Sequence, residues 1–176
     1  MRAPIGDFDD ARPATERREL LPPPVAAAVT AEMVHVDSDP AKADTAVFAA
    51  AYGEGLLRHS ANCVVVAGRR GGEVTLAACV VLSETRVDVN GAVRRHLGAR
   101  KASFAPMETA VGETGMEYGG ITPVGLPAGW PLLVDAAVVD TPWVLLGSGV
   151  RRGKLIVPGK LLAGLPGAVV LDGLGV

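Results

Sequence analysis

Two apolar runs joined by a short glycine-rich segment constrain the fold of this chain more than any other feature. Residues 62–67 and 74–82 consist mainly of valine, alanine and leucine, and residues 68–72 read Gly-Arg-Arg-Gly-Gly. Apolar runs of this length bounded by glycines are typical of β-strands, and the glycines suit a tight turn. We therefore predict an antiparallel β-hairpin.

Helices and further strands follow one another without a regular alternation. Helices are expected at about 25–30, 39–52, 88–97 and 106–115 and near Leu161, and strands at 33–37, 132–135, 143–146, 154–157 and 168–171. Asp39 and Asp88 can cap the helices that they precede, and Gly53, Gly98 and Gly115 can end them. A chain of 176 residues fits one domain. The pattern predicts a single α/β domain of the mixed α+β kind, with a mostly antiparallel or mixed sheet and inserted helices.

The N-terminal segment differs from the rest of the chain. Residues 1–24 mix charged residues with proline and end in three consecutive prolines. Consecutive prolines form a stiff extended segment that cannot propagate a helix. We predict that residues 1–24 form a flexible arm outside the core, and that residues 25–176 form the domain.

The composition indicates which residues build the core and which part of the chain an anionic partner would contact. Hydrophobic residues make up 49% of the chain and aromatic residues only 4%, so valine, leucine and alanine must build the core. Basic residues outnumber acidic ones only after His59, and an anionic partner should meet that part. Because no apolar run of about 18 residues and no signal-peptide core is present, we expect a cytoplasmic protein that does not engage a membrane. Cys63 and Cys79 should be buried free thiols.

The densest irregular segment runs from Met116 to Pro127. Gly119 and Gly120 allow close backbone approach, while Pro123 and Pro127 fix the path of the chain. Such a loop can present N–H groups to a carbonyl or an oxyanion, as acyl transfer requires. The same composition also fits a plain surface connection.

At this loop the sequence resembles a known family. Glu113-Thr114-Gly115 followed by Tyr118-Gly119-Gly120-Ile121-Thr122-Pro123-Val124-Gly125 resembles the signature of the YbaK/ProX family, with its GxxxP element at Gly119 to Pro123. Other pieces agree in order: residues 97–102, Val134-Asp135, and Gly147-Ser148-Gly149 before Lys154-Leu155. The resemblance covers about residues 30–172.

This resemblance implies an activity in translation fidelity. Family members are compact mixed α/β domains that hydrolyse mischarged aminoacyl-tRNA, either free-standing or inserted in prolyl-tRNA synthetase. Water would attack the ester without a metal, a cofactor or a covalent intermediate, and the glycine loop would hold the carbonyl. The resemblance implies an aminoacyl-tRNA deacylase that acts in trans on the acylated 3′ end of tRNA. An aminoacyl-tRNA synthetase and a second copy of the chain are further candidate partners.

One departure from the family leaves a second function open. The family usually has a functional lysine early in the strand where this chain has Asn62. An asparagine donates hydrogen bonds but supplies no cation. The alternative is a non-catalytic domain that binds aminoacyl-tRNA, a related small acylated ligand or a protein partner.

The resemblance and the loop chemistry together give a set of candidate site residues. The predicted catalytic residues are Gly119, Gly120, Thr122, Pro123 and Asn62. The predicted substrate-binding residues are Tyr118, Ile121, Asp135, Ser148 and His59. Asp135 could instead cap the following segment, Thr122 and Ser148 could be ordinary turn residues, and His59 could be a surface histidine. The three histidines lack ligand spacing, so no metal site is expected.

Basic residues gather in three places along the second part of the chain. Contacts with tRNA phosphates are predicted for Arg94, Arg95, Arg100, Lys101, Arg151 and Arg152. Arg69-Arg70 and Lys154 belong to the same clusters. Phosphate contacts of this kind position a nucleic acid without reading its sequence. A solvated charged surface would show the same composition.

Overall fold

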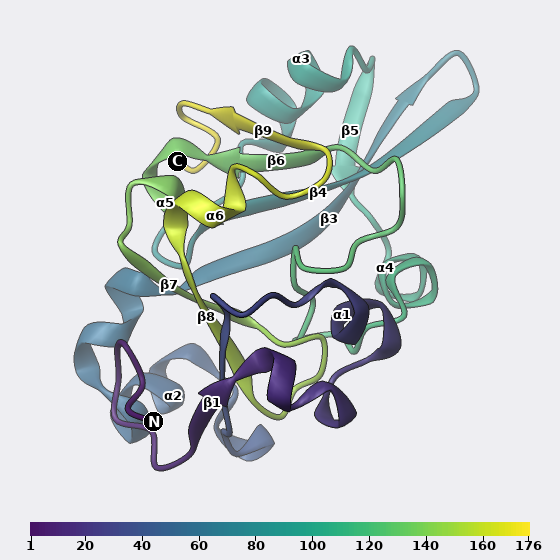
Figure 1. Ribbon diagram of the computed structural model, residues 1–176. Helices are drawn as coiled ribbons and strands as arrows, with labels where there is room; N and C mark the ends of the chain where they lie inside the picture. The colour runs from purple at the N-terminus through teal and green to yellow at the C-terminus, as the bar shows by residue number, and fades with distance from the viewer.

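Two β-sheets organise the protein (Figure 1). The computed structural model describes residues 1–176, apart from the side chain of Thr45. One sheet has four strands in the order β1-β2-β8-β7, and the other has five in the order β5-β3-β4-β6-β9. This architecture confirms the mixed α/β fold expected from the sequence.

The four-stranded sheet is antiparallel throughout and combines the two ends of the chain. It consists of β1 (Ala11–Pro13), β2 (Val34–Val36), β7 (Trp143–Gly147) and β8 (Lys154–Pro158). β2 lies between β1 and β8, with Ala11 opposite Val36 and His35 opposite Leu155. Strands β2, β7 and β8 are the ones that the apolar runs predict.

The five-stranded sheet is built on the predicted hairpin. It consists of β3 (Ala61–Arg70), β4 (Glu73–Leu82), β5 (Lys101–Phe104), β6 (Leu132–Asp135) and β9 (Ala168–Leu171). β3 and β4 are longer than predicted, because only Gly71 and Gly72, both with positive φ, form the turn. β6 runs parallel to β4 and β9.

Short helices connect the strands. They are α1 (Pro23–Ala28), α2 (Thr45–Tyr52), α3 (Arg94–Leu97), α4 (Met107–Thr114), α5 (Ala136–Val139) and α6 (Gly159–Leu162). The single helix predicted at 39–52 is divided. Asp39 accepts a hydrogen bond from the N–H of Ala41 at the start of a 3₁₀ turn, and Asp44 accepts one from Ala46 at the start of α2. Each aspartate therefore begins its own short element.

Asp88 caps the next helical segment as predicted. Its carboxylate accepts hydrogen bonds from the N–H groups of Gly91 and Ala92 at 3.1 and 3.0 Å, at the start of a π-helical turn that continues into α3. We expect Asp88→Ala to lower the free energy of unfolding by about 1 kcal/mol, as the loss of a cap does. Thermal melting would measure the change. Asn90→Ala is the control, because the Asn90 side chain is exposed, and equal melting of both variants would contradict the capping role.

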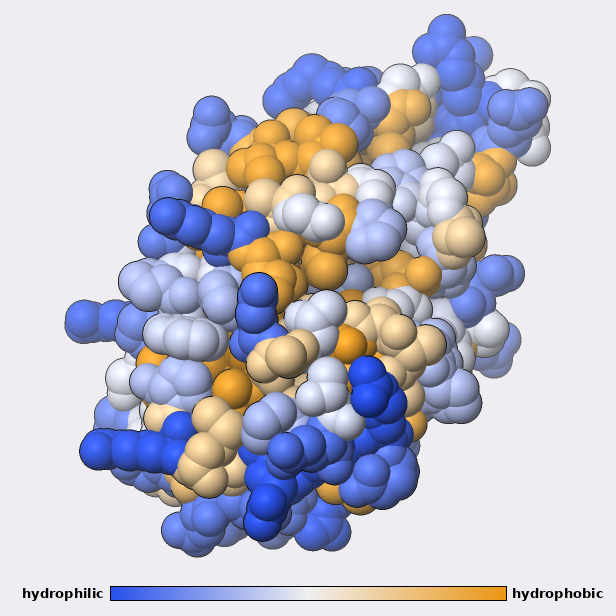
Figure 2. All heavy atoms as spheres, in the orientation of Figure 1, coloured by the Kyte–Doolittle hydropathy of each residue, from blue (hydrophilic) through white to orange (hydrophobic). Residues whose placement is uncertain are grey.

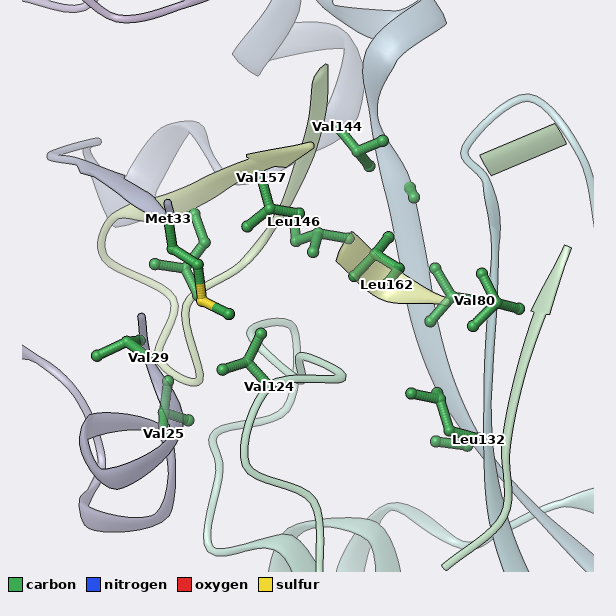
Figure 3. Packing of buried hydrophobic residues seen from close by; sticks show 14 of the residues in the cluster. Val25, Val29, Met33, Val80, Val124, Leu132, Val144, Leu146, Val157 and Leu162 are labelled. Carbon is green, nitrogen blue, oxygen red and sulfur yellow. The ribbon is translucent and has the colours of Figure 1, made fainter. Parts of the chain in front are cut away.

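The main core lies between α1, the two sheets and the loop that follows α4. Figure 3 shows Val25, Met33, Val124 and Leu146 converging on its centre from four different segments. Among the described residues, the fully buried members of this cluster are valine, leucine, alanine and methionine. The core is therefore aliphatic, as the composition predicts.

The N-terminal segment contributes to the core, contrary to expectation. β1 pairs with β2, and Ala14 and Leu21 are buried in the same cluster as Val25. Arg17 is buried, forms an ion pair with Asp10 and lies 3.3 Å from Nδ1 of His35. Residues 1–24 thus do not lie apart from the core. The charges and prolines that suggested an arm instead form a short strand, an ion pair between the buried Arg17 and the exposed Asp10, and the start of α1.

Both cysteines are free thiols, as predicted. Burial raises the pKa of Cys63 far above its ordinary range and raises the pKa of Cys79 to about 12. In the part of the chain that the structure describes, no helix has the length and hydropathy needed to cross a bilayer.

Candidate functional site

A cavity of about 360 Å³ opens where the two sheets diverge. A single bridge between Ser60 and Leu145 joins the start of β3 to β7. β5 pairs with β3 only from Val66 onward, so the first half of β3 leaves one edge for the cavity. The lining residues are Ala43, Phe48, Ala49, Leu56, Leu57, Ser60, Ala61, Asn62, Cys63, Val64, Val65, Ser83, Phe104, Ala105, Ala110, Tyr118, Gly119, Ile121, Leu145, Leu146, Gly147 and Lys154.

The glycine loop forms one wall of this cavity. Its backbone is held by hydrogen bonds from the N–H of Gly149 to the carbonyl of Gly120, at 2.7 Å, and from the N–H of Glu117 to the carbonyl of Gly149, at 2.9 Å. Within residues 1–176, the N–H groups of Gly119 and Ile121 donate to no other residue. Two backbone donors are therefore available in residues that line the cavity.

Gly120 and Gly147 lie where the backbone of the glycine loop approaches the backbone of β7 and of the turn that follows it. A Cβ atom on Gly120 would lie 2.5 Å from the carbonyl carbon and oxygen of Val150. A Cβ atom on Gly147, in β7, would lie 2.6 Å from the carbonyl oxygen of Gly120. The glycine loop and the turn after β7 thus fit together only because these positions carry no side chain.

The structure brings four of the predicted site residues together. Asn62, Tyr118, Gly119 and Ile121 line the cavity. Ala61 and Cys63 pack in the main core, so strand alternation directs the exposed Asn62 side chain to the opposite face of β3.

Three other loop residues lie behind this wall. Gly120, Thr122 and Pro123 are buried and do not contribute to the lining. The Thr122 hydroxyl has no hydrogen-bond partner among the described residues, and its N–H points to the sulfur of Met116 at 3.4 Å. Thr122 thus lies behind the wall of the cavity and does not line it.

The remaining predicted substrate-binding residues lie outside the cavity lining. Asp135 is buried at the end of β6 against Gly175, and its side chain makes no capping hydrogen bond to α5. The Ser148 hydroxyl donates to the carbonyls of Val150 and Arg152, which is the ordinary turn role. His59 is partly buried, with no partner for Nδ1 among the described residues.

Several cavity residues were not predicted from the sequence. Phe48 comes from α2, Ser60 precedes β3, and Lys154 begins β8. An apolar helix residue gives no sign that it faces a cavity rather than the core. Lys154 could have been recognised as a site residue, because it is a single cation at the start of an apolar strand. Its neighbours Arg151 and Arg152 suggested instead that it belongs to a charged surface cluster.

The chemistry of the lining restricts the mechanism. Burial keeps Cys63 a neutral thiol, which is a poor nucleophile. Across the described residues there is no group of three or more His, Cys, Asp or Glu side chains that could hold a metal ion. The lining therefore offers backbone N–H groups, the hydroxyls of Ser60, Ser83 and Tyr118, the Asn62 amide and the ammonium group of Lys154.

The basic residues form two separate surfaces. Arg69, Arg70, Arg100 and Lys101 line a shallow hollow at the tip of the β3–β4 hairpin, the hydrophilic tip at the upper right of Figure 2. Arg94 and Arg95 are exposed on nearby α3. Arg69 lies seven positions after Asn62 on β3, a distance of roughly 23 Å along the strand.

The second surface lies beside the cavity. The Arg151 guanidinium lies against Gly119, where a Cβ atom would be 2.5 Å from it. Arg152 instead donates two hydrogen bonds of 2.9 Å to Asp37. This contact lowers the pKa of Asp37, so Arg152 is already paired.

The family model of the aminoacyl-tRNA editing domain matches residues 39–165. No curated protein matches the chain. The crystal structure of a proposed trans-editing enzyme for prolyl-tRNA synthetase is 23% identical, has a TM-score of 0.72 and is matched over 90% of this chain and 95% of that one.

Two further solved structures share the fold. A protein studied as a scaffold for computational epitope grafting is 22% identical, with a TM-score of 0.72 over 90% of this chain and 96% of that chain. A hypothetical protein is 25% identical, with a TM-score of 0.64 over 74% of this chain and 83% of that chain.

Proposed function

Because the chain belongs to the family of aminoacyl-tRNA editing domains, we propose that it acts in trans as a deacylase of mischarged tRNA. The observation that carries the proposal is the cavity wall at Gly119 and Ile121, where two N–H groups have no partner among the described residues. Such donors can bind an ester carbonyl and stabilise the charge that develops on it. The cavity volume lies within the range of small-molecule sites.

The proposed reaction is hydrolysis of the ester by water. The water oxygen attacks the carbonyl carbon, and the bond from that carbon to the ribose oxygen breaks. The amino acid leaves as a carboxylate, and the ribose oxygen takes a proton to become a hydroxyl group. The glycine loop would hold the carbonyl oxygen during both steps, and the Ser83 hydroxyl is a candidate to hold the water. The Ser60 hydroxyl already donates a hydrogen bond of 2.6 Å to the carbonyl of Leu56.

The apolar walls support a role in discriminating amino acids. Phe48, Leu56, Leu57 and Leu146 surround the space that would receive the side chain of the amino acid. A pocket of this kind distinguishes one methylene by about 1–3 kcal/mol, which is why a second, hydrolytic selection is useful after aminoacylation.

Asn62 favours the second candidate function. The neutral Asn62 supplies no cation to the 3′ end, which fits a domain that binds aminoacyl-tRNA or a related acylated ligand without hydrolysing it. Incubation with a panel of charged tRNAs separates the two functions. A deacylase releases free amino acid faster than buffer alone, whereas a binding domain protects the ester or leaves its lifetime unchanged.

The basic hollow at the hairpin tip is proposed to bind the acceptor stem. Its distance from the cavity would let one tRNA place its 3′ end in the cavity and its backbone phosphates on Arg100 and Lys101. We expect the double variant Arg100→Ala, Lys101→Ala to raise KM for charged tRNA about tenfold and to weaken its salt dependence by about two phosphate contacts. Steady-state deacylation at several salt concentrations would measure both.

Lys160→Ala is the matched control for this prediction, because Lys160 is exposed on α6 and lies outside both hollows. A short acylated oligonucleotide that ends in CCA should be hydrolysed equally by the double variant and the wild type. An unchanged KM and salt dependence in the double variant would exclude the hairpin tip from tRNA binding.

A further inference from the structure

Lys154 is the one charged residue among the described residues that line the cavity. It begins β8, where it pairs with Gly147 of β7 on one side and Val36 of β2 on the other. Its ammonium group lies 5.5 Å from the centroid of the Phe48 ring, and Phe48 also lines the cavity. The sheet and α2 together therefore hold this cation at the apolar wall.

No acidic group neutralises Lys154 within the described chain. The ion pairs found there join Arg17 to Asp10 and Arg152 to Asp37. Burial, together with the nearby Arg151, lowers the pKa of Lys154. Removing an ammonium from water without a paired anion opposes folding. The cation–π interaction with the Phe48 ring offsets only part of this unfavourable free energy.

The position of Lys154 relates it to the glycine loop. Gly147, opposite Lys154 in the β7–β8 ladder, fits against the carbonyl oxygen of Gly120. Gly119 and Ile121 of the loop and Lys154 of the sheet thus line the same cavity. The N–H groups of the two loop residues have no partner among the described residues. An oxygen of a ligand that meets the loop donors, or a second oxygen of the same ligand, can meet the ammonium group.

We propose that Lys154 binds an anionic oxygen of the acylated 3′ end and is thereby a substrate-binding residue of the deacylase. The inference rests on the proposed function. Two oxygens of the substrate have the required chemistry: that of the phosphate preceding the terminal ribose, and the ester carbonyl oxygen as it becomes negative during hydrolysis.

Three variants test the proposal. Lys154→Met removes the charge and keeps a flexible apolar chain against Phe48, Lys154→Arg keeps the charge, and Lys160→Met is the control on an exposed lysine outside the cavity. We expect Lys154→Met to melt at the wild-type temperature or above it, because it removes an unpaired and partly buried charge. A structural lysine would instead give a lower melting temperature. Lys154→Gln provides a second neutral variant if methionine disturbs the packing.

Two measurements on each variant separate the sources of the oxygen. One is the dissociation constant for a CCA trinucleotide that carries an amino acid through a non-hydrolysable amide at its 3′ end. The other is the single-turnover rate of amino acid release from the charged tRNA that the wild type hydrolyses fastest. We expect Lys154→Met to lose about ten- to a hundredfold in affinity or in single-turnover rate. Lys154→Arg should recover part of this loss, and Lys160→Met should match the wild type.

A loss in affinity for the trinucleotide identifies the phosphate as the bound group, and a loss confined to the single-turnover rate identifies the ester oxygen. If the wild type releases amino acid and Lys154→Met and Lys154→Gln do so with unchanged constants, the inference is wrong while the proposed function stands. If the wild type binds the trinucleotide without releasing amino acid, hydrolysis is wrong, and affinity alone decides the role of Lys154. If the wild type neither binds the trinucleotide nor releases amino acid, both the proposed function and the inference about Lys154 are wrong.

Discussion

Gly120→Ala should abolish amino acid release from charged tRNA. The new Cβ atom would lie 2.5 Å from backbone atoms of Val150, which cannot rotate away as a side chain could. Either the glycine loop or the turn after β7 must move, and a displacement of about 1 Å at a reacting group costs about a hundredfold in rate. Overpacking of this kind should also lower the free energy of unfolding by about 1–3 kcal/mol.

Gly112→Ala is the matched control for this variant. Gly112 is exposed on α4, and nothing lies within 4 Å of the position that its Cβ atom would take. Alanine is the better helix former by about 1 kcal/mol, so this variant should melt at or above the wild-type temperature and keep full activity. Single-turnover release and thermal melting would be measured together. If Gly120→Ala folds and keeps wild-type activity, the glycine loop is not part of the catalytic site.

Deletion of residues 1–22 should abolish cooperative folding. It removes β1 and its hydrogen bonds to β2, the buried Ala14 and Leu21, and Arg17, which contacts His35. Loss of a buried leucine alone costs about 2–5 kcal/mol, against a total stability of about 5–15 kcal/mol for a domain. Circular dichroism during heating would show a broad, low or absent transition.

A shorter deletion is the control for the N-terminal segment. Removal of residues 1–9 keeps β1, Ala14, Arg17 and Leu21 but removes Phe8, which stacks on Tyr52 with ring centroids 5.0 Å apart. This variant should melt cooperatively at a temperature between that of the wild type and that of the longer deletion. A wild-type melting curve for the longer deletion would show that the segment does not stabilise the domain.

The sequence predicted best where one local rule decided the structure. The β3–β4 hairpin follows from two apolar runs and a glycine turn, and the helices that end at Gly98 and Gly115 follow from left-handed caps. β5 was not predicted, because Lys101 to Phe104 are mostly exposed and owe their extended form to pairing with β3. The extended form of β5 therefore depends on its pairing with β3, which no local sequence pattern predicts.

Only the part of the candidate site that a local sequence pattern marks was predicted. The run of glycines marked the loop, and Tyr118, Gly119 and Ile121 do line the cavity. Asp135 and Ser148 were placed in the site by motif order, but their side chains face Gly175 and the turn after β7. Lys154 reaches the cavity only because β7 and β8 pair in one particular register. Such convergence depends on strand order, which the sequence does not display.

Release of free amino acid tests most directly whether this cavity hydrolyses the ester of a charged tRNA. A panel of tRNAs, each charged with correct and incorrect amino acids, would be incubated with the wild type, Gly112→Ala and Gly120→Ala. We predict that the wild type and Gly112→Ala release amino acid from at least one mischarged tRNA well above the spontaneous rate, and that Gly120→Ala does not. Release at the spontaneous rate from every tRNA by the folded wild-type protein would contradict hydrolysis by this cavity and favour the non-catalytic binding domain.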